Sequence, residues 1–408
     1  MAQRNKLKIF NDPIYGFIGT PNELIFNLIA DPYFQRLRRI SQMGLSFLVY
    51  PGAHHTRFHH ALGSMHLMVQ AIRVLKFKKV LLTEDEENGL LVAILLHDIG
   101  HGPFSHALEY NLVGGIDHET ISLRFMEQLN RKYEGALSTA IKIFKGEHPR
   151  KFLNQLVSSQ LDMDRLDYLK RDSFYTGVTE GNISSERMIT MLNVFEGELV
   201  VEEKGIYSVE KFLMARRFMY WQVYLHKTGL VAEQLLIKLM NRARLLVQDG
   251  SVLECSNALV YFLKRNENES FDDNTLTQFS MLDDVDVLSA LKSWQFHSDF
   301  ILSKISSMLL DRNLLEIKIK NKAIDPERVA EKRSWVKTNY GLQDAELDYF
   351  VFSGEISNMA YNEKRQNINI LRKNEKLTDV AKASDHLSLK ALSKKVTKYY
   401  VCYPKESV

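Results

Sequence analysis

The stretch His97-Asp98-Ile99-Gly100-His101-Gly102-Pro103-Phe104-Ser105-His106 follows an apolar helical run and brings three imidazoles and a carboxylate close together in the chain. Zinc, manganese and iron favour mixed imidazole and carboxylate ligands, so adjacent His97 and Asp98 can supply two ligands to one ion. Gly100 and Gly102 permit the sharp turn that would return His101 and His106 over that ion. The stretch therefore predicts a metal site at the end of a buried helix.

Two further residues complete a ligand set. His60 lies about one helix upstream of the stretch, and Asp164 lies one helix pair downstream. A single core histidine is usually only hydrogen-bonded, but the four residues together favour a metal centre with open positions for water and a phosphate oxygen. The order His, His-Asp, Asp resembles the HD superfamily of metal-dependent phosphohydrolases. That resemblance implies a divalent transition metal (Mn, Fe, Zn or Ni), with Mg²⁺ an alternative that accompanies a nucleotide.

The composition is that of an ordinary globular protein. The chain has 408 residues, of which 45% are hydrophobic and 25% charged, and its net charge of +3 does not select a partner. The two cysteines exclude a disulfide framework and suit a reducing compartment. No signal-peptide or membrane-spanning stretch is evident, so we expect a cytoplasmic enzyme with no membrane partner.

Apolar spacing and few prolines predict a mainly α-helical fold with a small β-hairpin and a smaller mixed α/β C-terminal region. The resemblance to the HD superfamily implies that this is the HD-domain helical phosphohydrolase fold. The hairpin is expected at Glu198–Ser208, turning at Glu203-Lys204-Gly205, and strands at Asp348–Phe352 and Val396–Val401. We expect a phosphohydrolase domain over residues 1–320 and a basic region over 321–408 that serves packing or oligomerisation. The expected helices are Pro21–Ala30, Tyr33–Ile40, His59–Lys76, Glu84–His97, Asp117–Lys132, Pro149–Asp172, Ser208–Gln248 and Val285–Arg312.

Cations and proton donors surround the predicted metal ligands. Arg57 precedes His60 by three residues and Arg165 follows Asp164, so both guanidiniums should lie near the ion and bind phosphate oxygens. His118 is another candidate phosphate contact, although a plain helix N-terminal residue is the alternative. Glu109 lies three residues after His106, and a carboxylate against an imidazole would hold it as a proton donor.

Longer motifs resemble the deoxynucleoside triphosphate triphosphohydrolase branch, which includes the sterile-alpha-motif and HD-domain dNTPase and its bacterial relatives. The resemblance covers about Lys8 to Arg312 and implies hydrolysis of a dNTP to a deoxynucleoside and inorganic triphosphate, which is a dGTPase-like activity. The motifs are Asn11-Asp12-Pro13-Ile14-Tyr15-Gly16, Phe34-Gln35-Arg36-Leu37-Arg38, Tyr50-Pro51-Gly52-Ala53, Arg57-Phe58-His59-His60, the His97–His106 stretch and Tyr168-Leu169-Lys170-Arg171-Asp172.

By this resemblance, His106 would be the general acid for the 5′ oxygen, with His101 and Glu109 beside it in the catalytic group. The metal would be held by His60, His97, Asp98 and Asp164, and the phosphates by Arg57, His101, His118 and Arg165. Arg216 would reach the γ-phosphate. Gln42 and Asp172 would bind the 3′-hydroxyl, and Tyr168 and Tyr224 would close the sugar pocket against a 2′-hydroxyl.

A nucleotide activator site, between subunits of a homo-oligomer (dimer or tetramer), is also implied by the resemblance. Its candidate residues are Gln35, Arg38, His226 and Lys227. The chain departs from the family at four positions: Arg165 replaces lysine, Glu109 replaces aspartate, Tyr220 replaces histidine, and Ala30 stands where the activator site has aspartate.

Two alternatives to a dNTPase remain. The first is another HD phosphohydrolase, such as a nucleotidase or a phosphodiesterase, although three arginines are more than a monophosphate needs. The second is a protein with a vestigial site that binds nucleic acid or another partner, because Tyr399, Tyr400 and Tyr403 alternate with lysines in the basic tail. A packed strand with a charged outer face is the interpretation we favour for that tail.

Overall fold

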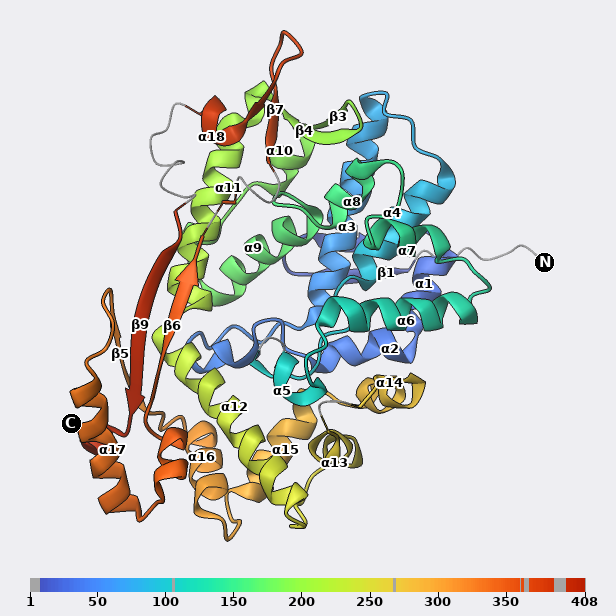
Figure 1. Cartoon of the computed structure of the whole chain (residues 1–408). Helices are drawn as coiled ribbons and strands as arrows, with labels where there is room; N and C mark the ends of the chain where they lie inside the picture. The colour runs from blue at the N-terminus through green and yellow to red at the C-terminus, as the bar shows by residue number, and fades with distance from the viewer. Residues whose placement is uncertain are drawn as a thin grey trace.

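The computed structural model describes residues 8–104, 107–266, 269–359, 361–362, 367–384 and 394–407. Helices dominate this part of the chain, which confirms the mainly α-helical prediction (Figure 1). The helices are α1 Glu23–Ala30, α2 Pro32–Gln35, α3 Arg57–Phe77, α4 Glu84–Leu96, α5 Glu109–Val113, α6 His118–Lys132, α7 Ser138–Phe144, α8 Lys151–Val157, α9 Met163–Thr176, α10 Ser185–Thr190, α11 Ile206–Met219, α12 Lys227–Gln248, α13 Asn257–Lys264, α14 Asp273–Ser280, α15 Asp284–Trp294, α16 Phe300–Leu310, α17 Pro326–Tyr340 and α18 Val380–Ala383.

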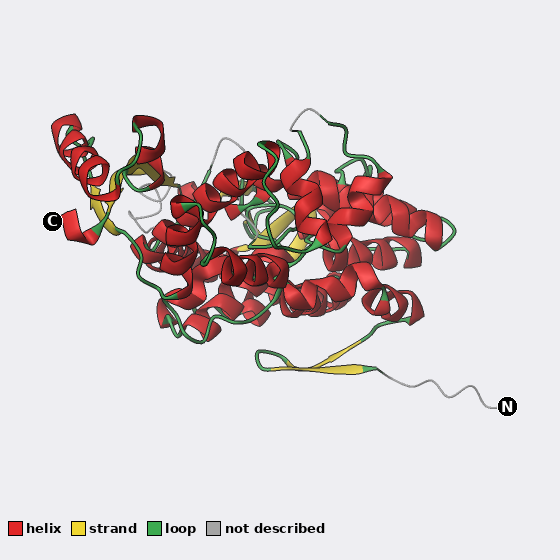
Figure 2. Cartoon of the chain, turned by 90° about the horizontal axis from the view of Figure 1, so that it is seen from below, coloured by secondary structure: helices red, strands yellow, loops and turns green. Residues whose placement is uncertain are grey.

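The strands form small sheets at the margins of the helical body. Strands β1 and β2 make an antiparallel hairpin near the N-terminus, at the edge of the body in Figure 2. The second sheet has the order β3-β4-β7-β8 and the third has the order β5-β9-β6. The strand bounds are β1 Ile9–Asp12, β2 Gly16–Gly19, β3 Leu192–Phe195, β4 Glu198–Glu202, β5 Glu316–Lys320, β6 Phe352–Asn358, β7 Asn369–Leu371, β8 Leu377–Asp379 and β9 Val396–Tyr403.

Helix α3 is central to the body because it packs against both α4 and α9. Caps fix where the two partner helices begin. The Thr83 hydroxyl accepts the Glu86 N–H at 3.2 Å and the Glu86 carboxylate accepts the Thr83 N–H at 2.9 Å, which is a capping box at the start of α4. Asp162 begins α9 by accepting the Arg165 N–H at 2.7 Å. These starts set the positions of the residues that follow in each helix.

Four of the expected helices are interrupted. The prediction of one continuous helix over Pro149–Asp172 is wrong, because the chain breaks between α8 and α9. There the Asp162 carboxylate accepts hydrogen bonds from the N–H groups of Ser159 and Arg165 and so starts a new helix. Tyr33–Ile40 is α2 followed by a 3₁₀ turn. Ser208–Gln248 is divided into α11, a π-helical turn at Tyr220–Tyr224 and α12, and Val285–Arg312 into α15 and α16, which Asp299 caps.

Two strand predictions also need correction. The hairpin turns at Glu196-Gly197, where both residues have positive φ (50° and 80°), and residues 203–205 instead form the 3₁₀ turn that leads into α11. Residues 344–349 are a 3₁₀ turn, so the strand expected at Asp348 begins only at Phe352. The predicted strand at Val396–Val401 is confirmed as β9, in which Tyr400 and Tyr403 are buried and so are not free to stack on bases.

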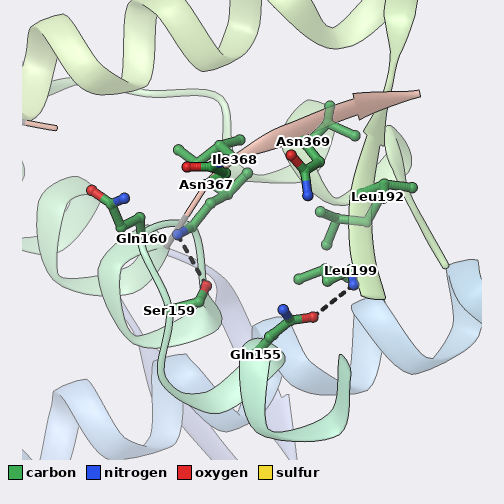
Figure 3. Close-up of a pocket in the computed structure, with 11 residues that line it drawn as sticks. Gln155, Ser159, Gln160, Leu192, Leu199, Asn367, Ile368 and Asn369 are labelled. Atoms are coloured by element: carbon green, nitrogen blue, oxygen red, sulfur yellow. Dashed lines mark hydrogen bonds between the residues drawn. The ribbon is translucent and has the colours of Figure 1, made fainter. Parts of the chain in front are cut away.

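The C-terminal segments pair with strands from earlier in the chain. β7 runs parallel to β4, with Val200 opposite Asn369, and β9 pairs with β5, with Ile317 opposite Cys402. Figure 3 shows where β7 closes a small pocket against α8 and β4, and there the Gln155 side chain accepts the Leu199 N–H at 2.7 Å. Within the described residues, no helix is both long and apolar enough to span a membrane.

Gly63 permits the close crossing of α3 and α9. A Cβ atom at Gly63 would lie 2.0 Å from Asp167 Oδ1 and 2.2 Å from Arg171 Nη2. Both atoms belong to a fully buried ion pair, so they have no free space to move into. Only glycine therefore fits at this point of α3.

We predict that Gly63→Ala destabilises the protein by about 3 kcal/mol, at the upper end of the usual effect of overpacking, because the added methyl separates α3 from α9. Urea unfolding followed by circular dichroism would measure the change. Gly229→Ala is the matched control: it is also helical, nothing lies within 4 Å of its added Cβ, and it should stabilise slightly. Equal unfolding midpoints for the two variants would contradict the crossing argument.

Candidate active site

Three helices bring the predicted metal ligands together. His60 lies in the first turn of α3, His97 and Asp98 directly follow α4, and Asp164 lies in the first turn of α9. Because α3 packs against both other helices, the ligand atoms converge at one point. His60 is fully buried, whereas His97 and Asp98 retain a little exposure toward a cavity.

The distances among these atoms suit a single ion. His60 Nε2 lies 3.1 Å from Asp164 Oδ1 and 3.3 Å from His97 Nε2, and His97 Nε2 lies 3.5 Å from Asp164 Oδ1. Asp98 Oδ1 is 3.4 Å from His97 Nε2. Ligands about 2.1 Å from an ion and about 90° apart would lie about 3 Å from each other. His60, His97 and Asp164 are therefore spaced as ligands of one metal ion, and Asp98 lies beside them in a second group with His101 and His118.

The opposite ring nitrogens of both histidines are already engaged. His60 Nδ1 donates to Asp167 Oδ2 at 2.7 Å, and His97 Nδ1 donates to the Ile94 carbonyl at 2.6 Å. With a proton on Nδ1, a neutral imidazole offers its Nε2 lone pair to a metal. The chemistry of the donor set therefore fits a divalent transition metal.

Without a metal, hydrogen bonds among these side chains shift their pKa values in opposite directions. Burial alone would lower the pKa of His60, but hydrogen bonds to Asp164 and Asp167 raise it to about 10. Burial would raise the pKa of Asp164, yet hydrogen bonds from His60 and His97 hold it well below its ordinary value. The surroundings of these side chains therefore favour positive charge at this point.

Asp167 and Arg171 support His60 from behind, and the sequence analysis missed this role. Arg171 donates to both Asp167 oxygens, at 2.9 and 3.0 Å, and to Asp12 Oδ2 at 2.8 Å. Asp167 and Arg171 are fully buried. The spacing could have revealed them, because Asp164 and Asp167 are three residues apart and Asp167 and Arg171 four, which puts all three on one helical face.

A second group lies beside the first and includes the candidate phosphate contacts. His101 Nε2 is 3.4 Å from Asp98 Oδ1, the His101 and His118 rings stack at 3.8 Å, and Arg57 forms an ion pair with Asp98. Burial and Arg57 hold the pKa of His101 well below its ordinary value, so its ring is neutral. Burial would lower the pKa of His118, but its hydrogen bond to Glu109 raises it.

A cavity of about 510 Å³ opens over both groups. It brings together His97, Asp98, Asp164, Arg57, His101, His118, Arg165, Gln42, Tyr168, Asp172 and Tyr224, all predicted from the sequence, and Tyr220, one of the departures from the family. Tyr224 donates to Asp172 Oδ2 at 2.7 Å, and His55 Nε2 lies 2.7 Å from Asp172 Oδ1. His55, which the sequence analysis did not select, precedes Arg57 by two residues.

Other predicted residues lie elsewhere. The Glu109 carboxylate accepts from His118 Nδ1 at 2.6 Å, and His106 is outside the described residues, so its expected pairing with Glu109 stays a prediction. Arg216 does not line the cavity but contacts the Tyr220 ring, 5.9 Å from its centroid.

The candidate activator residues make separate contacts. Arg38 donates to Gln35 at 2.8 Å, and His226, next to Lys227, caps α12. Asp31 is next to Ala30, and it caps α2 and pairs with Lys132 at 2.5 Å. The acidic side chain at this end of α1 is therefore engaged within the chain.

We predict that Mn²⁺ or Zn²⁺ binding releases about one proton from His60 at neutral pH, because its metal-free pKa lies near 10 and coordination needs the neutral ring. Apparent affinity should therefore rise with pH up to about 10. Calorimetry in buffers of different ionisation enthalpy would measure the protons released. His60→Ala should abolish binding, while His148→Ala, outside the site, should not. Binding without proton release would contradict the proposed ligand set.

Comparisons with known proteins agree with this geometry. The HD domain model matches residues 57–172, and the model of the HD associated region matches residues 183–253. The structure is similar to that of a phosphohydrolase from Bacteroides thetaiotaomicron, with a TM-score of 0.95, 48% identity, and coverage of 98% of this chain and 100% of that one.

Several relatives are similar in sequence, and two of them illustrate the range. The uncharacterized protein YwfO of Bacillus subtilis is 32% identical over 98% of this chain and 93% of its own length. The deoxynucleoside triphosphate triphosphohydrolase SAMHD1 homolog of Dictyostelium discoideum is 31% identical over 56% of this chain, and the match spans about half, 48%, of that relative. Full-length similarity, the HD model and the converging His and Asp ligands lead to one conclusion: the chain belongs to the HD-domain family of phosphohydrolases.

Proposed function

We propose that the protein hydrolyses deoxynucleoside triphosphates to a deoxynucleoside and inorganic triphosphate, with a divalent metal at the His60, His97, Asp98 and Asp164 site. The observation that carries the proposal is that one cavity is lined by candidate metal ligands, by arginine and histidine side chains that could bind phosphates, and by a hydrogen-bonded Tyr224–Asp172 pair that could bind a sugar. Relatives named as dNTP triphosphohydrolases, at 26–31% identity, support the same substrate class.

Buried polar atoms support the binding of a large polar ligand. Among the described residues that line the cavity, Arg165 Nε and Gln42 Oε1 are buried without a hydrogen-bond partner. Buried polar groups are rarely left unpaired, because each loses its hydrogen bonds to water. Phosphate oxygens would satisfy Arg165, and a sugar hydroxyl would satisfy Gln42.

Hydrolysis at the α-phosphorus requires a water oxygen to attack and the bond to the 5′ oxygen to break. When bound, the metal would polarise a phosphate oxygen and lower the pKa of water. Arg57 and Arg165 would hold the phosphates and balance their growing charge. His106 is expected to give its proton to the 5′ oxygen, and His118, held by Glu109, would bind a phosphate oxygen.

The sugar pocket would favour a deoxyribose. Tyr224 and His55 bind the two oxygens of Asp172, which fixes the carboxylate so that it can accept from a 3′-hydroxyl. Tyr168 and Tyr224 lie with ring centroids 6.2 Å apart at the same wall. A crowded, buried pocket of this kind would reject a 2′-hydroxyl that finds no partner.

We further propose that the protein works in the cytoplasm as a homo-oligomer and that a nucleotide activates it near Gln35, Arg38, His226 and Lys227. The support here is the family resemblance and the surface location of Gln35 and Arg38 beside the Asp31 end of α1. Testing each dNTP both alone and in mixtures would reveal such activation.

We predict that manganese-loaded protein converts dNTPs to deoxynucleosides and intact triphosphate, resolved by ion-exchange chromatography. Asp98→Asn should lower kcat by about 10³-fold or more, because it weakens a metal ligand. The control Asp85→Asn, at the exposed start of α4, should retain activity. Release of orthophosphate or pyrophosphate from dNTPs, or turnover of monophosphates only, would contradict the proposal and favour another phosphohydrolase reaction.

A further inference from the structure

Glu233 places a carboxyl group at the cavity wall, and neither the metal site nor the proposed phosphate contacts use it. It comes from α12, which packs against the 3₁₀ turn Gly44–Leu48. Met43, Gly44 and Ser46, near that turn, also line the cavity, as does Leu225 just before α12. Glu233 thus belongs to the part of the cavity lining that α12 and the segment around Gly44–Leu48 provide.

The Glu233 carboxyl has no hydrogen-bond or ion-pair partner among the described residues. Burial raises its pKa to about 7, and no charged neighbour contributes to the shift. A nearby guanidinium would lower that pKa instead. Arg57 and Arg165 lie on α3 and α9, not on α12, and their ion pairs are with Asp98 and Asp162.

This separation indicates which part of a nucleotide Glu233 would meet. A carboxylate would repel the triphosphate, which belongs beside the arginines and the metal ligands. The proposed sugar contacts Gln42 and Tyr224 immediately precede Met43 and Leu225, two apolar residues of the Glu233 wall. A base attached to that sugar would lie between these apolar residues with its polar edge toward Glu233.

We propose that Glu233 recognises the nucleobase and selects guanine by accepting hydrogen bonds from its two adjacent N–H groups. This inference rests on the proposed function, since it assumes a nucleotide whose sugar lies at Asp172. Above its pKa of about 7, the Glu233 carboxyl group is ionised and only accepts hydrogen bonds, and paired bonds to a charged group are strong. Guanine alone among the four bases offers adjacent N1–H and N2–H donors. Adenine and cytosine offer a donor beside an acceptor, and thymine offers one donor between two acceptors.

The test compares the wild-type protein with Glu233→Gln, which keeps the size of the side chain but presents one donor and one acceptor. All four dNTPs compete in one mixture with manganese-loaded protein, so that product ratios report relative kcat/KM. Wild type should prefer dGTP, and Glu233→Gln should lower the dGTP to dATP ratio by about 10- to 100-fold, as expected for loss of a charged hydrogen-bonded pair. Glu119→Gln, another cavity glutamate, is the matched control and should keep the wild-type ratio.

A binding measurement separates this inference from the proposed function. Non-hydrolysable α,β-methylene analogues of dGTP and dATP are titrated into the same proteins. A guanine preference that Glu233→Gln removes would support the base contact even if no dNTP is hydrolysed, in which case only the proposed reaction fails. An equal base ratio in wild type and Glu233→Gln, with both proteins folded by circular dichroism, would overturn the role of Glu233.

Discussion

A buried chain of hydrogen-bonded charges, His60–Asp167–Arg171–Asp12, supports the candidate metal centre. It joins α3 to α9 and ties the N-terminal hairpin to the same point, because Asp12 ends β1. Removing one member would leave its partners charged and buried, which typically costs about 3–5 kcal/mol. The same chain sets the tautomer of His60 and so aims its Nε2 atom at the other ligands. The packing of α3 on α9 and the orientation of His60 therefore depend on the same buried hydrogen bonds.

Charge is unevenly distributed around the cavity, and this distribution would orient the proposed substrate. Arg57, Arg165 and the histidines lie on the side of the metal ligands, where anionic phosphates would be stabilised. Glu233 comes from α12, on another part of the cavity lining, and burial alone raises its pKa. A nucleotide has an anionic triphosphate at one end and an uncharged base at the other, so it fits this distribution of charge in only one orientation.

The candidate ligands could be selected from the sequence because His97 and Asp98 are adjacent and stand between His60 and Asp164 in a known order. The structure brings three of them, His60, His97 and Asp164, close together. The positions of most helices could also be predicted from apolar periodicity. The break at Asp162 could not be predicted, because the apolar periodicity continues through this residue while its side chain caps a new helix. Asp167 and His55 were missed because their roles depend on contacts with Arg171 and Asp172. Glu233 was missed because only tertiary packing shows that this residue of α12 lines the cavity.

The central claim is that Asp167 positions His60 for a metal, and metal affinity of Asp167→Asn tests it most directly. Competition with a fluorescent chelator would give Kd for Mn²⁺ in wild type and variant, with circular dichroism to confirm that both are folded. The account predicts an affinity about 10- to 100-fold weaker in the variant, as for other carboxylates that orient ligand histidines. An unchanged Kd in a folded Asp167→Asn protein would contradict it.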